Sequence, residues 1–399
     1  MFRPNSLSLI LLVGGLMAFS VISTDVYLPG LPTLAEYFRT DPSVIALTLS
    51  VYLAGFAVGQ LVYGPLSDRF GRRPTLLGGA IIFIAASVAC AVAPTIETLI
   101  AARFFQAAGA CSGQVIGRAI LRDRHKAVET TRMLSYATAM MGTISAVAPA
   151  IGGLILQTVG WRFVFVLMTV YGGVIVVVLW RGFQETLTVR NPAATRMVPM
   201  LRNFAFLLRE RTFAGYTTSL CFMFAAIYTY LAGGPFVFIQ VLGLSPFHFG
   251  LSFTAIALCF SSGSILAGRL ATRLDPDLVY LAAACLATTA AIVLAGIGAS
   301  RWLNVITFLI PFGIMTFGLG VLLPIGFSGA LAPHARIAGT ASALLGVLQA
   351  LASMTAGYVA GVVFDGTAAP ITTLMAVFTA AMLISFVVII LPRRVSAGT

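Results

Sequence analysis

The sequence predicts an all-α integral membrane protein with twelve transmembrane helices arranged in two six-helix halves. Two features of its composition support this class: 59% of the 399 residues are hydrophobic, and only 9% are charged. A soluble domain of this length carries much more charge on its surface. The third feature is a recurring apolar run of about 20 residues, the length that a helix needs to cross a hydrocarbon core of about 30 Å.

Twelve apolar runs, bounded by charge, proline or glycine, are expected to form the spans. The first run is too long for the hydrophobic region of a signal peptide and has no evident cleavage site before Asp25, so we interpret it as a span. The expected spans cover residues 6–36, 43–63, 75–94, 98–119, 133–155, 162–182, 212–232, 247–267, 278–299, 303–328, 339–362 and 371–391.

Most basic residues fall on one side of these spans. With a cytoplasmic N-terminus, 20 of the 24 Lys and Arg residues lie in cytoplasmic segments, three lie outside, and Arg103 lies within a span. The positive-inside rule therefore predicts that both termini are cytoplasmic. The net charge of +12 does not predict a nucleic-acid partner, because the basic residues form no single patch with interleaved aromatic residues.

The longest polar stretch, residues 184–211, divides the chain into an N-terminal half (1–183) and a C-terminal half (212–399). Its basic character fits either a segment on the membrane surface or an ordinary connecting loop. The halves show a faint repeat, because GPLSDR (64–69) and GRLATR (268–273) both follow the second span of their half. The five cysteines lie in apolar runs and have neither disulfide nor metal-ligand spacing.

The loop GPLSDRFGRRP, residues 64–74, concentrates charge between the second and third spans. Taken alone, it is also typical of an ordinary basic turn. Its pattern resembles the G-x-L-a-D-r-x-G-r-[kr] signature of the major facilitator superfamily, in which this loop acts as a cytoplasmic latch between helices. The resemblance implies a gating role for Gly64, Asp68, Arg69, Gly71, Arg72 and Arg73. We expect Asp123, at the end of the fourth span, to pair with one of these arginines.

Further stretches narrow the branch of the family. LIAARFFQAAGA (99–110) resembles the fourth-span motif, with Ala107 in place of a glycine, and GTISAVAPAIGG (142–153) resembles the fifth-span antiporter motif, with Ala148 before Pro149. The latter resemblance implies gating roles for Pro149, Gly152 and Gly153. Together with DVYLPGLP, GLSPFHFG and GTASALLGVLQ, these stretches resemble the Bcr/CflA (bicyclomycin and chloramphenicol resistance) branch of the drug:proton antiporters.

This resemblance implies a central cavity between the halves and alternating access across the bacterial inner membrane. It implies proton-coupled export of small, mostly apolar antimicrobials, with no cofactor beyond the proton gradient. We expect a monomer whose partners are drug-like substrates, protons and the lipid bilayer. A transporter of a defined metabolite, such as a purine or a sugar, is the alternative. An enzyme is not expected, because the three histidines are scattered and no catalytic or metal-ligand cluster is visible.

Only two charged residues lie far from the ends of their spans, Asp25 and Arg103. A charge inside a span costs roughly 2.5–3.5 kcal/mol on insertion scales, which makes both residues candidates for function. Each is expected about 7 Å outside the midplane, at 1.5 Å per residue. We therefore predict that they interact, directly or through water, and serve proton coupling. The alternatives are that Asp25 caps or accompanies a kink before Pro29 and Pro32, and that Arg103 ties backbone carbonyls.

A polar stripe is predicted on the fourth span. At 100° per residue, Arg103, Gln106, Ala110 and Gln114 share one face, which must meet protein or water rather than lipid. The central cavity and interhelical hydrogen bonding explain the glutamines equally well. As substrate contacts we predict Tyr27, Gln106, Gln114, Tyr230 and Gln349. Aromatic side chains with few fixed hydrogen bonds favour broad specificity.

Overall fold

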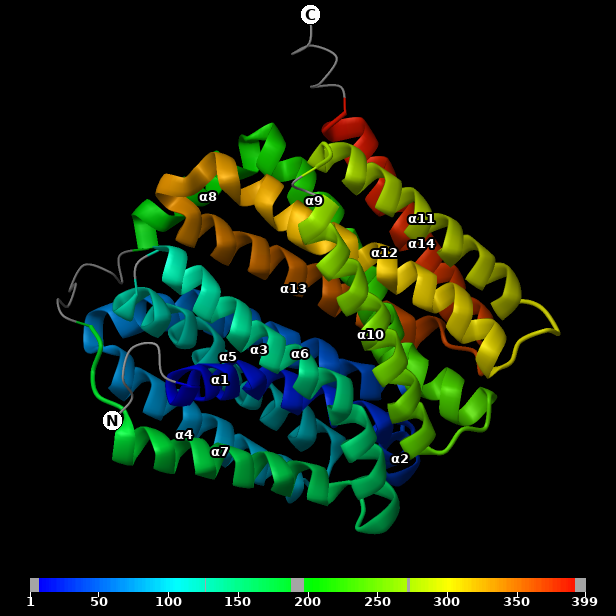
Figure 1. Ribbon diagram of the computed structural model, residues 1–399. Helices are drawn as coiled ribbons and strands as arrows, with labels where there is room; N and C mark the ends of the chain where they lie inside the picture. Colours follow the sequence, from blue (N-terminus) through cyan, green and yellow to red (C-terminus); the bar gives the residue numbers. More distant parts are fainter. Residues whose placement is uncertain (1–6, 126, 188–196, 271–272, 392–399) are drawn as a thin grey trace, which may run out of the picture. The chain divides into compact units, whose positions relative to one another are not determined.

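A computed structural model describes residues 7–125, 127–187, 197–270 and 273–391, and within these ranges it contains helices and turns but no strand (Figure 1). The chain divides into two compact units. The first contains Met1–Asp41, Leu47–Arg196 and Ser245–Leu251, and the second contains Pro42–Ala46, Met197–Leu244 and Ser252–Thr399. The predicted boundaries at residues 183 and 212 stay predictions.

The first unit is built mainly from seven helices. They are α1 (Leu7–Asp25), α2 (Leu31–Phe38), α3 (Pro42–Phe70), α4 (Arg72–Ala91), α5 (Ile96–Arg124), α6 (Ala127–Thr158) and α7 (Arg162–Gly182). A short 3₁₀ turn, η1 (Leu28–Gly30), joins α1 to α2. Helix α1 packs against α5 and α6, and α4 packs against α5 and α7.

The second unit is built mainly from another seven helices and two irregular turns. The helices are α8 (Met197–Arg209), α9 (Arg211–Phe236), α10 (Pro246–Leu270), α11 (Pro276–Gly298), α12 (Val305–Leu331), α13 (Ala338–Val363) and α14 (Ala369–Ile389). The turns are η2 (Val237–Val241) after α9 and η3 (Ala332–Ile337) after α12. Helix α8 shows that the last part of the 184–211 segment is helical, whereas residues 188–196 lie outside the described residues.

The faint sequence repeat corresponds to a repeat in packing. Helices α3 and α10 begin at Pro42 and Pro246, and α4 and α11 begin at Arg72 and Pro276, so both pairs are 204 residues apart. Contacts repeat as well: α1 packs on α5 and α6 as α9 packs on α12 and α13, and α4 packs on α5 and α7 as α11 packs on α12 and α14. The two units therefore share these helix pairings, although α9 also packs extensively on α14, whereas the corresponding helices α1 and α7 make few contacts.

Eleven helical segments of the described chain are long and apolar enough to span a membrane. The fourth expected span, α5, is not among them, because its polar and charged residues lower its hydropathy. Its 29 residues correspond to about 43 Å at 1.5 Å per residue, which is ample for a crossing. Its polar groups at Arg103 and Gln106 are buried inside the first unit, away from lipid. With α5 included, the described chain contains twelve candidate membrane-spanning segments, which agrees with the number that the sequence predicts.

Candidate functional site

Asp25 is the last residue of α1, where the first span is interrupted. Pro29 and Pro32 follow, and a proline ends a helix because it lacks a backbone donor and restricts the residue before it. The carboxyl group is buried, with 7% of the residue exposed. Ser145 Oγ, from α6, donates to Oδ2 at 2.5 Å, and Thr24 Oγ1 donates to Oδ1 at 2.9 Å. The chain turns here, as the kink alternative predicts, and it also holds a buried acid.

Arg103 lies on α5 and is completely buried. Its Nη1 donates to the carbonyl oxygen of Ser23 at 2.8 Å and to Gln106 Oε1 at 2.6 Å. The guanidinium carbon lies 4.5 Å from the ring centroid of Tyr27 and 4.3 Å from that of Tyr52, within the range of cation–π attraction. Nε and Nη2 are buried and have no hydrogen-bond partner within the described part of the chain. The cation is therefore held by two aromatic faces rather than by an acid.

The direct form of the predicted interaction between Asp25 and Arg103 is not found, since neither residue takes part in an ion pair in the described chain; an interaction through water stays a prediction. The physical reason is that each charge already has other partners, hydroxyl groups around the acid and a carbonyl with two rings around the cation. The expected similarity of depth agrees with the structure, because Arg103 binds the carbonyl of Ser23, two residues before Asp25.

Gln106 is buried and its amide is fully used inside the first unit. Oε1 accepts from Arg103, while Nε2 donates to Ser87 Oγ at 2.8 Å and lies 3.3 Å from Met168 Sδ. These bonds join α5 to α4 and α7, which favours the interhelical alternative over a substrate contact. Gln114, two turns further along α5, is half-buried.

Tyr27 is 2% exposed and lies between Arg103 and α3. Its hydroxyl group is 2.9 Å from Thr48 Oγ1, and the Tyr52 hydroxyl is 2.9 Å from Ser23 Oγ. The two tyrosines are thus fixed by hydrogen bonds while their rings cover the guanidinium group. The geometry assigns Tyr27 to holding Arg103 rather than to contacting substrate.

Ser145 was not predicted, although it lies inside the GTISAVAPAIGG stretch. Its position seven residues before Gly152 places both residues on one face of α6, turned toward α1. A Cβ on Gly152 would overlap the carbonyl oxygen of Val26, so glycine permits α6 to approach the chain directly after Asp25. A Cβ on Gly153 would overlap the carbonyl oxygen of Pro246, a residue of the same unit. Pro149 is buried within α6.

The loop between α3 and α4 contains the predicted ion pair. Arg72 is 3% exposed; its Nε donates to Asp123 Oδ2 at 2.9 Å, and its Nη1 donates to Ser67 Oγ at 2.7 Å and to Asp68. The pairing of Asp123 with an arginine of this loop is therefore confirmed. Gly71 adopts a φ of +109°, which disfavours side chains other than glycine.

The other predicted residues of the loop make weaker contacts. Arg73 Nη2 donates to the carbonyl of Trp180 at 3.0 Å, and exposed Arg69 lies over the ring of Phe70 at 5.2 Å. A Cβ on Gly64 would meet nothing within 4 Å, so close packing does not explain this glycine. Within the loop, Arg72 is the residue that joins α3, α4 and α5.

Two unpredicted glutamates fix the ends of the 184–211 segment to helix N-termini. Glu185 accepts from the backbone nitrogens of Arg72 at 2.9 Å and Arg73 at 3.1 Å. Burial raises the pKa of Glu185, but hydrogen bonds from four backbone N–H groups outweigh burial and leave the pKa below its usual value.

Glu210 accepts from the backbone nitrogen of Phe213 at 2.7 Å at the start of α9, and lies 3.3 Å from His334 Nε2. Neither acid could be predicted from the sequence, because an exposed (Glu185) or half-buried (Glu210) acid next to a basic segment is common.

The predicted contacts of the second unit lie on α9 and α13, which pack against each other. The Tyr230 ring is 4.3 Å from Phe312 and 6.2 Å from Phe253, centroid to centroid. The Tyr230 hydroxyl, Gln349 Nε2 and Ser353 Oγ are all buried, and none of them has a hydrogen-bond partner among the described residues. A buried unsatisfied polar group costs about 1–3 kcal/mol, so such groups call for an explanation.

The helical bundle, its internal repeat and its buried charges define a polytopic membrane transporter. A sequence model described as "Major Facilitator Superfamily" matches residues 13–357, and the chain belongs to this family. Its transporters are not enzymes, and the described residues contain no group of three or more potential metal ligands.

Three known proteins illustrate the relationship. The chain is 31% identical over 371 residues to the uncharacterized MFS-type transporter YdgK of Bacillus subtilis, covering 92% of each chain. It is 30% identical over 360 residues to Multidrug resistance protein D of Escherichia coli, covering 88% of each. The solved structure of a D-xylose–proton symporter matches with a TM-score of 0.76 at 16% identity, over 96% of this chain and 98% of that one. The resistance-protein relative agrees with the drug:proton antiporter branch indicated by the motifs.

Proposed function

We propose that this protein is a proton-coupled exporter of small, mostly apolar antimicrobials in the bacterial inner membrane. It works by alternating access as a monomer, with both termini in the cytoplasm, and takes its energy from the proton gradient without a cofactor. The family and the relative named Multidrug resistance protein D support this proposal. The observation that carries it is the buried carboxyl group of Asp25.

Asp25 binds two hydroxyl groups and, among the residues that the structure describes, is paired with no cation. A contacting arginine would hold the acid ionised. A hydroxyl group instead donates to a carboxylate and accepts from a protonated acid, so Ser145 can satisfy both states. This environment suits a group that takes up and releases a proton during each cycle. Arg103 supplies a fixed buried positive charge nearby, held by Tyr27, Tyr52 and Gln106.

Substrate contacts are proposed for Tyr230 and Gln349, with Gln114 as a further polar contact. The unpartnered hydroxyl and amide groups in the second unit fit a neutral substrate that carries carbonyl, ether or nitro oxygens. The surrounding phenylalanines fit its apolar body. Gating is proposed for the Arg72 ion pairs and for Pro149, Gly152 and Gly153 of α6.

Inside-out vesicles with an imposed pH gradient test this function. With an acidic lumen, wild-type protein should accumulate a phenicol or bicyclomycin, and Asp25→Asn should reduce accumulation to background. Glu36→Gln is the matched control, because it removes an exposed acid of α2 in the same span. Both variants should retain substrate exchange across the membrane without a gradient.

Three outcomes would contradict the proposal. Normal drug accumulation in vesicles that contain Asp25→Asn would contradict the proposed role of Asp25 in proton coupling. If the pH gradient drives the accumulation of none of the tested drugs, the proposal of proton-coupled drug export is contradicted. Uptake of a purine or a sugar in place of drugs would favour the metabolite alternative.

A further inference from the structure

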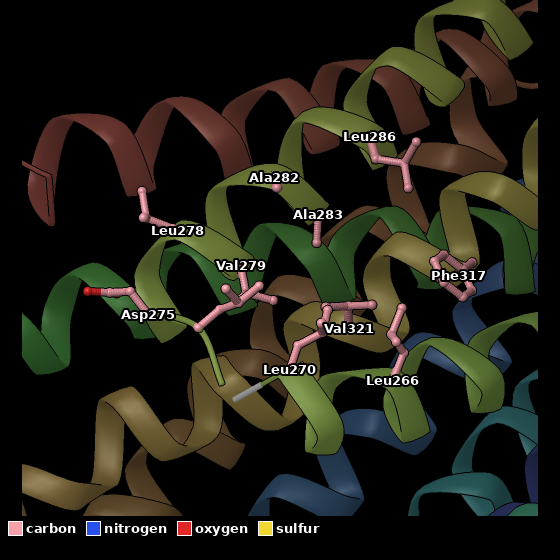
Figure 2. A pocket seen from close by; sticks show the side chains of 11 residues that line it. Leu266, Leu270, Asp275, Leu278, Val279, Ala282, Ala283, Leu286, Phe317 and Val321 are labelled. Carbon is pink, nitrogen blue, oxygen red and sulfur yellow. The ribbon is translucent and has the colours of Figure 1, made fainter. Parts of the chain in front are cut away.

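An apolar groove runs along α10, α11 and α12 in the second unit (Figure 2). It has a volume of about 340 Å³. Leu266 and Leu270 of α10 form one wall, and Phe317 and Val321 of α12 form the floor. Eleven residues line the groove; only Asp275, at the N-cap of α11, is polar.

The groove exists because α11 presents small side chains between large ones. Leu278, Ala282 and Leu286 are four residues apart and form one row, visible along α11 in Figure 2. The outer two are 55% and 42% exposed, so they form a rim, and the alanine between them leaves a notch. On a membrane-spanning helix an exposed apolar surface meets lipid chains. The groove therefore opens where hydrocarbon is available to fill it.

The length of the groove matches one leaflet of a bilayer. From Asp275 to Leu286, α11 rises about 16 Å at 1.5 Å per residue. This is about half of the roughly 30 Å hydrocarbon core. The groove begins at the end of a predicted span, at the membrane surface, and ends near the middle of the bilayer. An acyl chain of one leaflet can lie along its whole length.

The charges at the surface end of the groove favour a phosphate. Arg269 and Arg273 are exposed and directly precede the groove residues Leu270 and Leu274. The two acids nearby are engaged in other bonds: Asp275 Oδ1 accepts from the backbone nitrogen of Asp277 at 2.9 Å, and Asp277 accepts from the Tyr216 hydroxyl. In Figure 2 the carboxylate of Asp275 points away from the apolar side chains. The phosphate of a phospholipid head group can pair with these two guanidinium groups.

We propose that this groove binds one membrane phospholipid, with an acyl chain between α10 and α11 and its phosphate at Arg269 and Arg273. The lipid fills a space that the protein side chains leave open, which adds dispersion contacts along the three helices. The site is separate from the residues assigned to transport and does not depend on the proposed function.

A photoreactive phospholipid tests this site. The protein is reconstituted into vesicles of phosphatidylethanolamine and phosphatidylglycerol that contain a phosphatidylglycerol with a diazirine in one acyl chain. After illumination, peptide mapping should place the label within residues 266–286. Ala282→Phe fills the notch and should lower this labelling several-fold. Thr289→Phe, at an exposed threonine two turns further on the same face of α11 and outside the groove, should leave labelling unchanged.

A second measurement tests the head group and guards against a folding defect. In detergent, added phosphatidylglycerol should raise the thermal midpoint of wild type and Thr289→Phe, and raise those of Ala282→Phe and Arg273→Gln less. Equal labelling and equal stabilisation of wild type and Ala282→Phe would show ordinary bulk lipid and overturn the site. Displacement of the label by an alkyl quaternary ammonium compound, but not by unlabelled phospholipid, would also overturn it and identify a site for cationic amphiphiles.

Discussion

The cores of the two units share one packing scheme but contain different chemistry. The first unit buries an acid and a guanidinium group, each with its own set of partners. The second unit buries neutral hydroxyl and amide groups. Among the described residues, those of Thr217, Tyr230, Gln349 and Ser353 include an atom without a partner, as does the guanidinium group of Arg103 in the first unit. In its described membrane-spanning segments no Asp, Glu, Lys or Arg is buried. One repeated scaffold thus holds charge in one unit and neutral polar groups in the other.

This difference suggests a division of labour. The two charged groups of the first unit are held by fixed partners, the acid by two hydroxyl groups and the cation by the hydrogen bonds of Nη1 and by two aromatic rings, because a buried charge without partners is costly. Groups that wait for a substrate are left unsatisfied until it binds. We therefore assign proton coupling to the first unit and neutral substrate contacts to the second.

The largest effect is expected for Arg103→Leu, which removes the completely buried cation of α5. The carbonyl of Ser23 and Oε1 of Gln106 lose their donor, at a cost of about 1–3 kcal/mol each, and proton-driven transport should be abolished. Drug resistance of cells and the thermal midpoint of the purified protein measure both effects. Arg162→Leu is the control, because Arg162 also stacks on an aromatic ring, at 4.3 Å from Trp161, but is less buried. Unaltered drug resistance of cells that produce Arg103→Leu would contradict the assignment of proton coupling to the first unit.

A smaller effect is expected from the loop that joins α3, α4 and α5. Asp123→Asn weakens the ion pair with buried Arg72 and should cost about 1–2 kcal/mol, because Asp123 is itself 15% exposed. Arg69→Ala, an exposed arginine of the same loop, should cost less than about 0.5 kcal/mol. Thermal unfolding in detergent measures the stability of both variants. Equal thermal midpoints for Asp123→Asn and Arg69→Ala would contradict the claim that the Arg72 ion pair stabilises the loop.

The linker glutamate of the first unit should make stability depend on pH. Its pKa is lowered from 4.5, so its stabilising contribution is fully present above 4.5 and is lost as the pH falls through the lower folded-state pKa. Glu185→Gln should therefore lower the thermal midpoint at neutral pH and differ little from wild type well below 4.5. A difference between the thermal midpoints of wild type and Glu185→Gln that grows on acidification would contradict the predicted direction of the pH dependence. Glu36→Gln is the control for loss of an exposed acid.

The smallest effect on stability is expected from a matched pair of tyrosines. Tyr27→Phe removes a hydroxyl that is bonded to Thr48, and should cost about 1 kcal/mol. Tyr230→Phe removes a buried hydroxyl without a partner and should therefore raise stability, by about 1 kcal/mol, while weakening substrate binding up to about tenfold. Thermal unfolding and substrate titration measure the two effects. An equal loss of stability in both variants would remove the contrast between the units.

The sequence predicts the fold well because membrane spans are set by length and hydropathy. The sequence also predicts Asp25 and Arg103 as candidate functional residues, because a charged residue within an apolar run is easily recognised. Their partners could not be predicted, because the hydroxyl groups of Ser145 and Thr48 and the ring of Tyr52 resemble many others in apolar helices. The glutamine stripe on α5 was recognised, but only the structure shows that Gln106 is used by Arg103, Ser87 and Met168.

Proton release on substrate binding tests the central role of Asp25 most directly. Substrate is added at saturating concentration to purified protein in a weakly buffered solution with a pH indicator, at a pH where the acid is protonated before substrate arrives. Wild type and Glu36→Gln should release protons, whereas Asp25→Asn should bind substrate and release none. Equal proton release by Asp25→Asn and wild type would contradict the assignment of the exchanged proton to Asp25.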